Sequence, residues 1–137
     1  MNTHQTARSN MIACQIRPNK VRDERVLTAM ETVPREKFVP STMAGIAYID
    51  EDIQVARGRY LLEPMVLARL LQEAAIKSND RVLDIACATG YSTAVLSMIA
   101  HEVVGVEIDA GLQTQATASL ADLKITNAVV HVGALTE

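Results

Sequence analysis

The stretch from Arg81 to Asp109 constrains the fold more than any other part of the chain. It opens with an apolar run, Val82 to Ala86, that is short and follows polar turn residues, as is typical of a buried strand. Small residues fill positions 87–90, helical spacing follows from Tyr91 to Ala100, and a second apolar run covers 103–108. Strand, loop, helix and strand in this order predict a right-handed βαβ unit on a parallel sheet.

Two acids fall near the carboxyl ends of the predicted strands. Asp84 lies in the first strand and Glu107 in the second, and ligands of open parallel sheets bind outside these ends. Glu107 also follows Gly90 at close to the ~20-residue offset at which an acid meets ribose hydroxyls in dinucleotide folds. We therefore expect a nucleoside ligand at this edge.

The loop between these strands does not suit a dinucleotide. A carboxylate at Asp84 repels a phosphate and attracts an amine or a sulfonium. The small residues Ala86, Ala88 and Gly90 also depart from the G-x-G-x-x-G pattern. A cationic nucleoside without phosphate fits best, and S-adenosylmethionine is such a compound. A nicotinamide dehydrogenase is disfavoured, whereas a purely structural βαβ unit with solvated acids remains open on spacing alone.

Composition excludes several classes of protein. The 137 residues suffice for one domain with a core, and a net charge of −3 gives no electrostatic case for nucleic acid. No apolar run approaches the ~18 residues of a membrane span, and the polar start lacks a signal peptide. With only Cys14 and Cys87, a disulfide framework is not expected, and a cytoplasmic location is the simplest assignment.

Metal and thiol chemistry are both disfavoured. The histidines at positions 4, 101 and 131 have no ligand spacing among them. Cys87 lies in the loop before a helix, but no histidine is near it in sequence to act as a base. We interpret it as a small loop residue.

The remaining periodicity predicts helices around the βαβ unit. We expect a helix over 5–16, a second one capped by Asp23, and a third that begins at Pro64, followed after the second strand by a helix over 112–123 and a third strand over 128–132. The helix after Pro64 is expected to bury one face, made of Val66, Leu67, Leu70, Leu71, Ala74 and Ala75. The predicted segments are 1–61, helical and irregular, and 62–137, which contains the sheet.

Three segments resemble the protein-L-isoaspartate O-methyltransferase family. They are DERVLTAMETVPREKFVP at 23–40, EPMVLAR at 63–69, and the stretch from Arg81 to Asp109. The resemblance implies an α/β, Rossmann-like S-adenosylmethionine-dependent methyltransferase fold, of which this chain holds the N-terminal part only. It also implies transfer of a methyl group to the carboxylate of L-isoaspartyl residues in damaged proteins, with isoaspartyl-containing proteins as partners and neither nucleic acid nor membrane.

The chain departs from the family at several site positions. The resemblance places cofactor contacts at Asp84, Ala86, Ala88, Gly90, Glu107 and Ala134, and a substrate-binding serine at the position of Leu62. Ala86 and Ala88 stand where the family has glycines, and Ala134 stands where it has an acid. These departures leave two alternatives: a degenerate relative that acts as a binding or scaffold protein, and a methyltransferase with another acceptor.

The resemblance also implies further strands and helices beyond this sequence. With strand order 3-2-1, the first strand becomes an open edge, and an apolar open edge invites pairing with another chain. We therefore interpret the chain as the N-terminal part of a longer protein, and expect it either to self-associate through this edge or to be a truncated piece of that protein.

Overall fold

The computed structural model describes residues 2–134 and 136, and the chain divides into two compact units, Met1–Ile76 and Lys77–Glu137. This division falls after residue 76, whereas a boundary after residue 61 is expected from the sequence. The helix that begins at Pro64 stays with the first unit because it contacts the second helix and the turn after the first.

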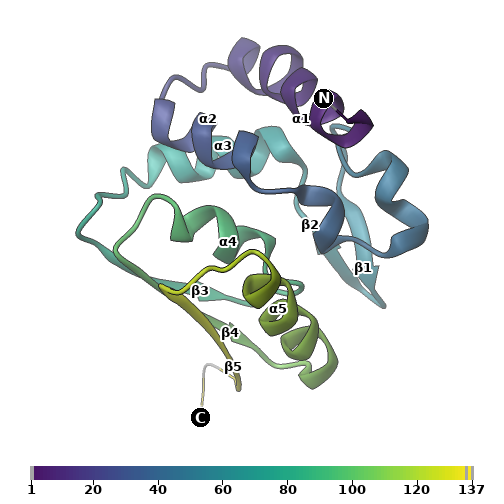
Figure 1. The fold of residues 1–137 in the computed structure, drawn as a ribbon. Helices are drawn as coiled ribbons and strands as arrows, with labels where there is room; N and C mark the ends of the chain where they lie inside the picture. Colours follow the sequence, from purple (N-terminus) through teal and green to yellow (C-terminus); the bar gives the residue numbers. More distant parts are fainter. Residues whose placement is uncertain (1, 135, 137) are drawn as a thin grey trace. The chain divides into compact units, whose positions relative to one another are not determined.

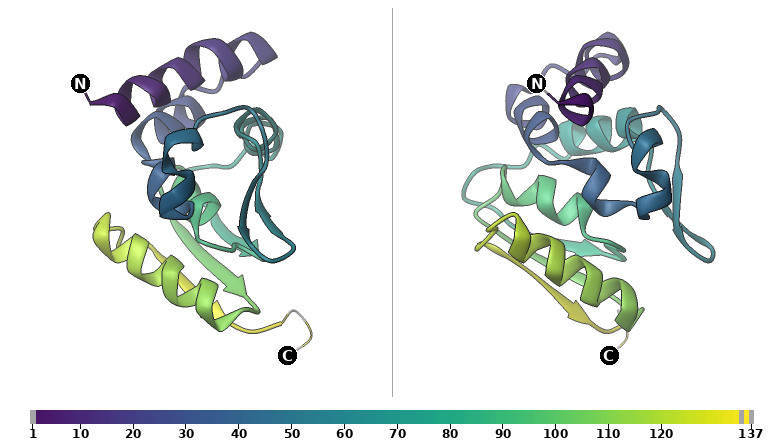
Figure 2. Two further views of the ribbon diagram at one scale, coloured as in Figure 1. Left: turned by 90° about the vertical axis from the view of Figure 1, so that its right-hand side faces the viewer. Right: turned by 45° about the vertical axis from the view of Figure 1, so that its right-hand side comes forward.

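The first unit contains helices and one short hairpin (Figures 1 and 2). Its elements are α1 (Thr3–Met11), η1 (a π-helical turn, Ile12–Ile16), η2 (Arg17–Asn19), α2 (Glu24–Thr32), η3 (Arg35–Phe38), η4 (Ser41–Ile46), β1 (Ile53–Ala56), β2 (Arg59–Leu61) and α3 (Pro64–Glu73). The segment 41–60 forms η4 and most of the antiparallel β1–β2 hairpin.

Local signals in the sequence set the ends of two helices. The Asp23 carboxylate accepts a hydrogen bond from the backbone N–H of Arg25 at 3.0 Å, so Asp23 caps α2 as predicted. Pro64 is the first residue of α3, where its missing N–H costs no hydrogen bond. The predicted first helix is α-helical only as far as Met11 and then widens into η1.

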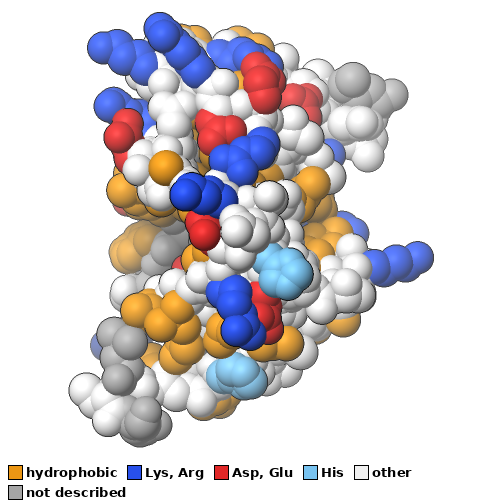
Figure 3. All heavy atoms as spheres, turned by 90° about the vertical axis from the view of Figure 1, so that its left-hand side faces the viewer, with side chains coloured by type: hydrophobic (Ala, Val, Ile, Leu, Met, Phe, Trp, Pro, Cys, Tyr) orange, Lys and Arg blue, Asp and Glu red, His pale blue; other side chains and the backbone are white. Residues whose placement is uncertain are grey.

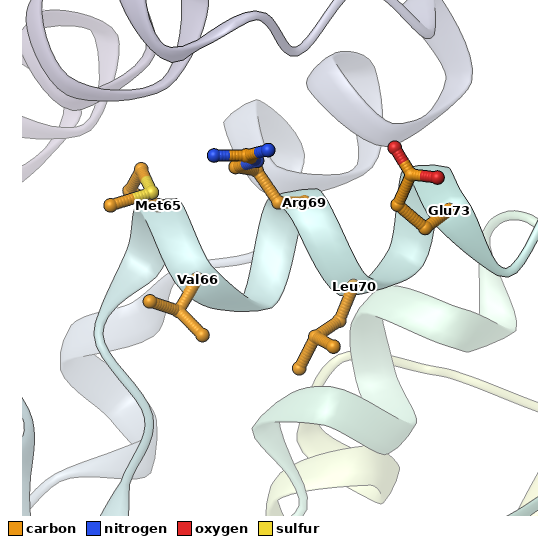
Figure 4. A pocket seen from close by; sticks show the side chains of 5 residues that line it. All are labelled: Met65, Val66, Arg69, Leu70 and Glu73. Carbon is orange, nitrogen blue, oxygen red and sulfur yellow. The ribbon is translucent and has the colours of Figure 1, made fainter.

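The buried face of α3 is narrower than predicted. Leu67, Ala68 and Leu71 are buried, whereas Leu70 is 57% exposed and Val66 only half-buried. Figure 4 shows Val66 and Leu70 one turn apart on the same flank of the helix. The expectation that Leu70, Ala74 and Ala75 are buried is wrong, because α3 packs on α2 and η1 with Leu67, Ala68 and Leu71 among its buried residues and ends at Glu73.

The second unit is a three-stranded parallel sheet with two helices. Its elements are β3 (Arg81–Ile85), α4 (Tyr91–Ser97), β4 (Glu102–Glu107), α5 (Ala110–Asp122) and β5 (Ala128–Val132). The strand order is β3-β4-β5, which confirms the predicted 3-2-1 order with the first strand at an edge. In Figure 1, α4 and α5 lie on the same face of this sheet.

The core of this unit lies between the sheet and its two helices. Tyr91, Ala94 and Val95 of α4, Val103 of β4 and Ala116 of α5 have no exposed surface. Alternate residues of β4 are buried and half-buried, as expected where helices cover one face of a strand. Within residues 2–134 and at 136, no helix is long and apolar enough to cross a membrane.

Candidate functional site

The loop from β3 to α4 has an unusual backbone. Ala86, Ala88 and Gly90 have φ angles of 58°, 52° and 92°, in the left-handed region. An L-residue there costs ~1–2 kcal/mol relative to its ordinary conformation. The two alanines therefore have the left-handed backbone conformation that glycine adopts without strain. Each also carries a side-chain methyl group that glycine lacks.

Hydrogen bonds to β4 hold this loop in place. The backbone N–H of Ala86 donates to the carbonyl of Val106 at 2.7 Å, and that of Gly90 donates to the carbonyl of Cys87 at 2.9 Å. The N–H of Ala88 donates to Oε1 of Glu107 at 2.8 Å. The strained loop is thus fastened to the carboxyl end of the neighbouring strand.

The carboxylate of Glu107 is the most buried charged group of the loop region. It has no exposed surface. Its second oxygen, Oε2, accepts a hydrogen bond from the backbone N–H of Asp109 at 2.8 Å. Glu107 therefore joins the β3–α4 loop to the start of α5, which Asp109 caps through the N–H of Leu112 at 2.9 Å.

Asp84 has a different set of partners. Its Oδ2 accepts hydrogen bonds from the hydroxyls of Ser92 and Thr93, at 2.7 and 2.8 Å, in the first turn of α4. Burial raises the pKa of Asp84 above its ordinary value, and these two hydrogen bonds oppose that rise. Asp84 therefore ties β3 to α4 and is mostly hidden from solvent.

Both acids lie on the helix-covered face of the sheet. Asp84 pairs with Gly105 across β3 and β4, and Glu107 follows two positions later on the same side of β4. The sequence contains no lysine or arginine between Arg81 and Lys124. The carboxyl ends of β3 and β4 are therefore acidic, and residues 82–123 supply no lysine or arginine to bind a phosphate there.

Two glycines make this close packing feasible. A Cβ on Gly90 would lie 3.0 Å from the Cβ of Ala116 in α5. A Cβ on Gly105 would lie 2.9 Å from the sulfur of Cys87 and 3.1 Å from the hydroxyl of Thr93. The loop thus packs against both β4 and α5 because these positions lack side chains.

Cys87 is a packing residue in this arrangement. It is buried, and burial raises the pKa of its thiol to about 11. At neutral pH its thiolate is therefore scarce, which argues against a nucleophile.

We predict that a thiol reagent at pH 7.5 titrates one rapidly reacting cysteine per native chain, because Cys14 is exposed and Cys87 is buried. The substitution Cys14→Ser should remove the fast phase. Unfolding in urea should make the Cys87 thiol reactive in both the wild type and the variant. Two fast equivalents in the native protein would contradict the buried placement of Cys87.

Two predicted site positions remain: Ala134 lies in the second unit and Leu62 in the first. Ala134 follows the end of β5, and its neighbour Gly133 donates its backbone N–H to the carbonyl of Glu107 at 3.1 Å. Asp84, the loop, Glu107 and Ala134 thus gather at the carboxyl ends of three adjacent strands. Leu62 belongs to the first unit, between β2 and α3, with its side chain 37% exposed.

Sequence reasoning missed a buried arginine beside Leu62. Arg35 has no exposed surface, and it donates to the carbonyls of Ala47 at 2.6 Å and Leu62 at 3.0 Å. Tyr48 accepts from the Arg35 backbone N–H at 3.0 Å and donates to Glu36. No sequence signal marks the burial of this guanidinium.

Comparison with known proteins identifies the family. The model of the family described as protein-L-isoaspartate(D-aspartate) O-methyltransferase matches residues 6–135. The chain belongs to this family. Its relatives include protein-L-isoaspartate O-methyltransferase 2 of Anaeromyxobacter sp., 38% identical over 95% of this chain and 53% of the relative, and protein-L-isoaspartate O-methyltransferase 1 of Rhodopseudomonas palustris, 39% identical over 92% and 51%. The chain thus spans about half the length of these family members.

Solved structures show the same fold. A protein-L-isoaspartate O-methyltransferase aligns with a TM-score of 0.77 at 24% identity, over 92% of this chain and 42% of that chain. A putative one from Plasmodium falciparum, in complex with S-adenosyl-L-homocysteine, also aligns with a TM-score of 0.77 at 21% identity, over 100% and 66%. These likenesses confirm the predicted Rossmann-like methyltransferase architecture. Among the residues described, no group of three or more His, Cys, Asp or Glu is arranged to hold a metal ion.

Proposed function

We propose that this chain contributes the S-adenosylmethionine-binding half of a protein-L-isoaspartate O-methyltransferase. One observation carries the proposal: the left-handed β3–α4 loop is hydrogen-bonded to a buried acid at the end of the next strand, in a stretch, 82–123, that contains no lysine or arginine. Such an edge favours a cationic nucleoside over a phosphate-bearing one.

The carboxylates at the strand ends fit the ribose of this cofactor. Carboxylate oxygens suit the two hydroxyls of a ribose, and Glu107 lies at the end of β4 where ligands of open parallel sheets bind. Its two oxygens accept hydrogen bonds from the backbone N–H groups of Ala88 and Asp109. Because Glu107 has no exposed surface, hydrogen bonds from a ribose to its carboxylate require a local shift of the residues that cover it.

The residues of this chain would act by holding and orienting. When bound, S-adenosylmethionine supplies a methyl group on a sulfonium, and an isoaspartyl carboxylate is already ionised at neutral pH. No general base is then required, and alignment of the two reactants can supply up to ~7–11 kcal/mol of the barrier reduction. Asp84 would supply negative charge that favours a sulfonium, and the Ala86–Gly90 backbone would hold the cofactor beside it.

Leu62 supports a second candidate, a family member that binds the cofactor but uses another acceptor or none. Its side chain has no hydroxyl, and its carbonyl is already bonded to Arg35. An incoming carboxylate that lacks a donor loses ~1–3 kcal/mol. Isoaspartyl-containing proteins remain the proposed partners, and the cytoplasm the proposed location.

Calorimetric titration with S-adenosyl-L-homocysteine tests the cofactor proposal. Saturable binding at one site per chain is expected, and the absence of heat up to millimolar ligand would refute it. Radiolabelled methyl transfer to an isoaspartyl peptide, with the matching aspartyl peptide as control, then tests the acceptor. Cofactor binding without transfer to either peptide would favour the second candidate.

The substitution Ala86→Gly is expected to tighten S-adenosyl-L-homocysteine binding by about tenfold, equivalent to ~1.4 kcal/mol. The Ala86 methyl group is exposed on the loop, where it takes space beside the site. Ala75→Gly is the matched control: its φ is 51°, so relief of backbone strain should stabilise both variants alike. An equal gain in affinity in the control would contradict a specific effect of the loop methyl group.

A further inference from the structure

The strand β5 forms one edge of its sheet. Among the described residues, the order β3-β4-β5 gives β5 a single neighbouring strand. The carbonyl of Asn127 accepts a hydrogen bond from the N–H of Val103 at 2.9 Å, and the N–H of Gly133 donates to the carbonyl of Glu107 at 3.1 Å. Successive residues of a strand direct their backbone groups to alternate sides. The N–H and C=O groups that point away from β4 therefore belong to Ala128, Val130 and Val132.

The sequence of β5 lacks the features that usually prevent an edge strand from pairing. Its five residues, 128–132, include no lysine, proline or acid, and its register with β4 has no bulge. The side chain of Gln113 in α5 donates to the carbonyl of Val130 at 2.9 Å, but a carbonyl oxygen has a second lone pair. The other edge strand, β3, contains Arg81 and Asp84. Of the two edges, β5 is therefore better suited to accept another strand.

The helix beside this edge has an exposed flank without charge. α5 contacts β4 and β5, and Asp122 at its end is the only charged residue among its 13. Gln113, Thr117 and Ala121 follow one another at four-residue spacing, so they lie on one side of the helix, where Thr117 and Ala121 are exposed. A surface helix usually carries charged side chains on its outer face. Depletion of charge is typical of the centre of a protein–protein interface.

A hollow of about 330 Å³ lies between α5 and β5, and it is lined only by uncharged residues. Its lining includes Gln113, Thr117, Ala121, Ile125, Ala128 and Val129. Figure 3 shows hydrophobic side chains at the surface beside the histidines and a few charged groups. The open strand edge, the hollow and the flank of α5 thus form one continuous uncharged surface.

We propose that a second copy of this chain pairs with β5, antiparallel to it, about a two-fold axis at Val130. In this register Val130 faces its counterpart in the second copy, and Ala128 of each copy faces Val132 of the other. All three residues with outward backbone groups then form hydrogen-bonded pairs, and each such pair exchanges two N–H···O bonds. The two sheets become one continuous sheet, and neither copy keeps an open β5 edge.

A second copy supplies both parts that this surface requires. α5 connects two parallel strands, so it runs antiparallel to β5. A two-fold axis perpendicular to the sheet places both α5 helices on the same face, side by side and antiparallel, where their dipoles attract. Each uncharged flank then meets an identical one, as in any isologous contact, so the net charge of −3 on each chain adds no repulsion at the contact. An isolated extended peptide would pair with the edge but leave the hollow and the helix flank in water.

The test measures the oligomeric state of the 137-residue chain by sedimentation equilibrium. We expect a dimer whose fraction rises with concentration. Thr117 accepts a hydrogen bond from Gln113 at 3.1 Å and so lies near the axis at Val130. Thr117→Glu and Thr117→Lys should each weaken the dimer by about tenfold or more, because like charges then face each other. An equimolar mixture of these two variants should associate more tightly than either one alone.

Gln115→Glu is the matched control. It adds the same charge at an exposed position of α5, about half a turn around the helix from Thr117, so its dimerisation should equal that of the wild type. Circular dichroism shows whether each variant is folded. Ala121→Glu and Ala121→Lys, which also line the hollow, replace a Thr117 variant that does not fold.

Amide hydrogen exchange then locates the contact. Exchange of the N–H groups of Val130 and Val132 should slow as the protein concentration rises. A monomer up to millimolar concentration would overturn the proposal, as would equal weakening of the dimer by Thr117→Glu and Gln115→Glu. Protection of the amides of β3 in place of those of β5 would assign the dimer to the other edge of the sheet and would overturn it as well.

Discussion

Replacement of Gly90 by alanine is expected to lower the free energy of unfolding by about 2–4 kcal/mol. The φ angle of 92° is strained for any residue with a Cβ, and the new methyl group would lie 3.0 Å from the Cβ and 3.3 Å from the Cα of Ala116. Ala116 is fully buried on α5, so it has no free space into which to move. Urea unfolding followed by circular dichroism measures the change.

Gly133→Ala is the matched control in the same unit. A Cβ there meets nothing within 4 Å, and its φ is outside the left-handed region, so its stability should change by less than about 1 kcal/mol. The double variant Gly90→Ala with Ala116→Gly should recover the steric part of the loss and leave the backbone strain. If Gly90→Ala unfolds like the wild type, the packing of the loop on α5 is wrong.

The second large effect is expected for Glu107→Gln. Two backbone N–H groups, of Ala88 and Asp109, point at the two oxygens of this side chain. An amide offers one oxygen and one NH₂, so one buried donor then faces another donor. The loss of a charge-assisted hydrogen bond costs ~1.5–3 kcal/mol, and relief of the buried charge offsets part of it, leaving about 2 kcal/mol of lost stability.

Cofactor binding should weaken in the same variant, because the loop keeps its backbone hydrogen bonds to Val106 but loses the one between Ala88 and the Glu107 carboxylate. Glu102→Gln provides the control: that residue forms an exposed ion pair with Arg81, which contributes at most ~1 kcal/mol. Equal stability losses in the two variants would contradict the role assigned to Glu107. Titration with S-adenosyl-L-homocysteine is made on the folded variant, as judged by circular dichroism. Weaker binding by a folded variant then indicates a change in the loop and not unfolding of the protein.

The βαβ order and most element positions could be predicted from the sequence, because they follow from local periodicity and end signals. Asp23 caps α2 and Pro64 opens α3 through interactions within a few residues. The apolar runs that form β3, β4 and β5 are short and flanked by polar or turn residues. These features need no knowledge of distant contacts.

Sequence spacing predicted where the candidate site residues of the second unit lie, but not which hydrogen bonds they form. Spacing placed Asp84, the small-residue loop and Glu107 at the strand ends. Spacing gave no indication that Glu107 accepts a hydrogen bond from the loop backbone, or that the hydroxyls of Ser92 and Thr93 donate to Asp84. Hydrogen bonds between strands depend on register, and register is set by the packed sheet.

The left-handed backbone conformation of Ala86 and Ala88 likewise depends on the tertiary structure. Local preference would give Ala86 and Ala88 ordinary dihedrals, and only their fastening to Val106 and Glu107 holds them at positive φ. The exposure of Leu70 and the burial of Arg35 have the same origin, since each depends on which neighbours the chain brings near. The sequence by itself determined the order and type of the elements of this protein. Only the tertiary structure decided which polar groups are satisfied, because their partners are far apart in the chain.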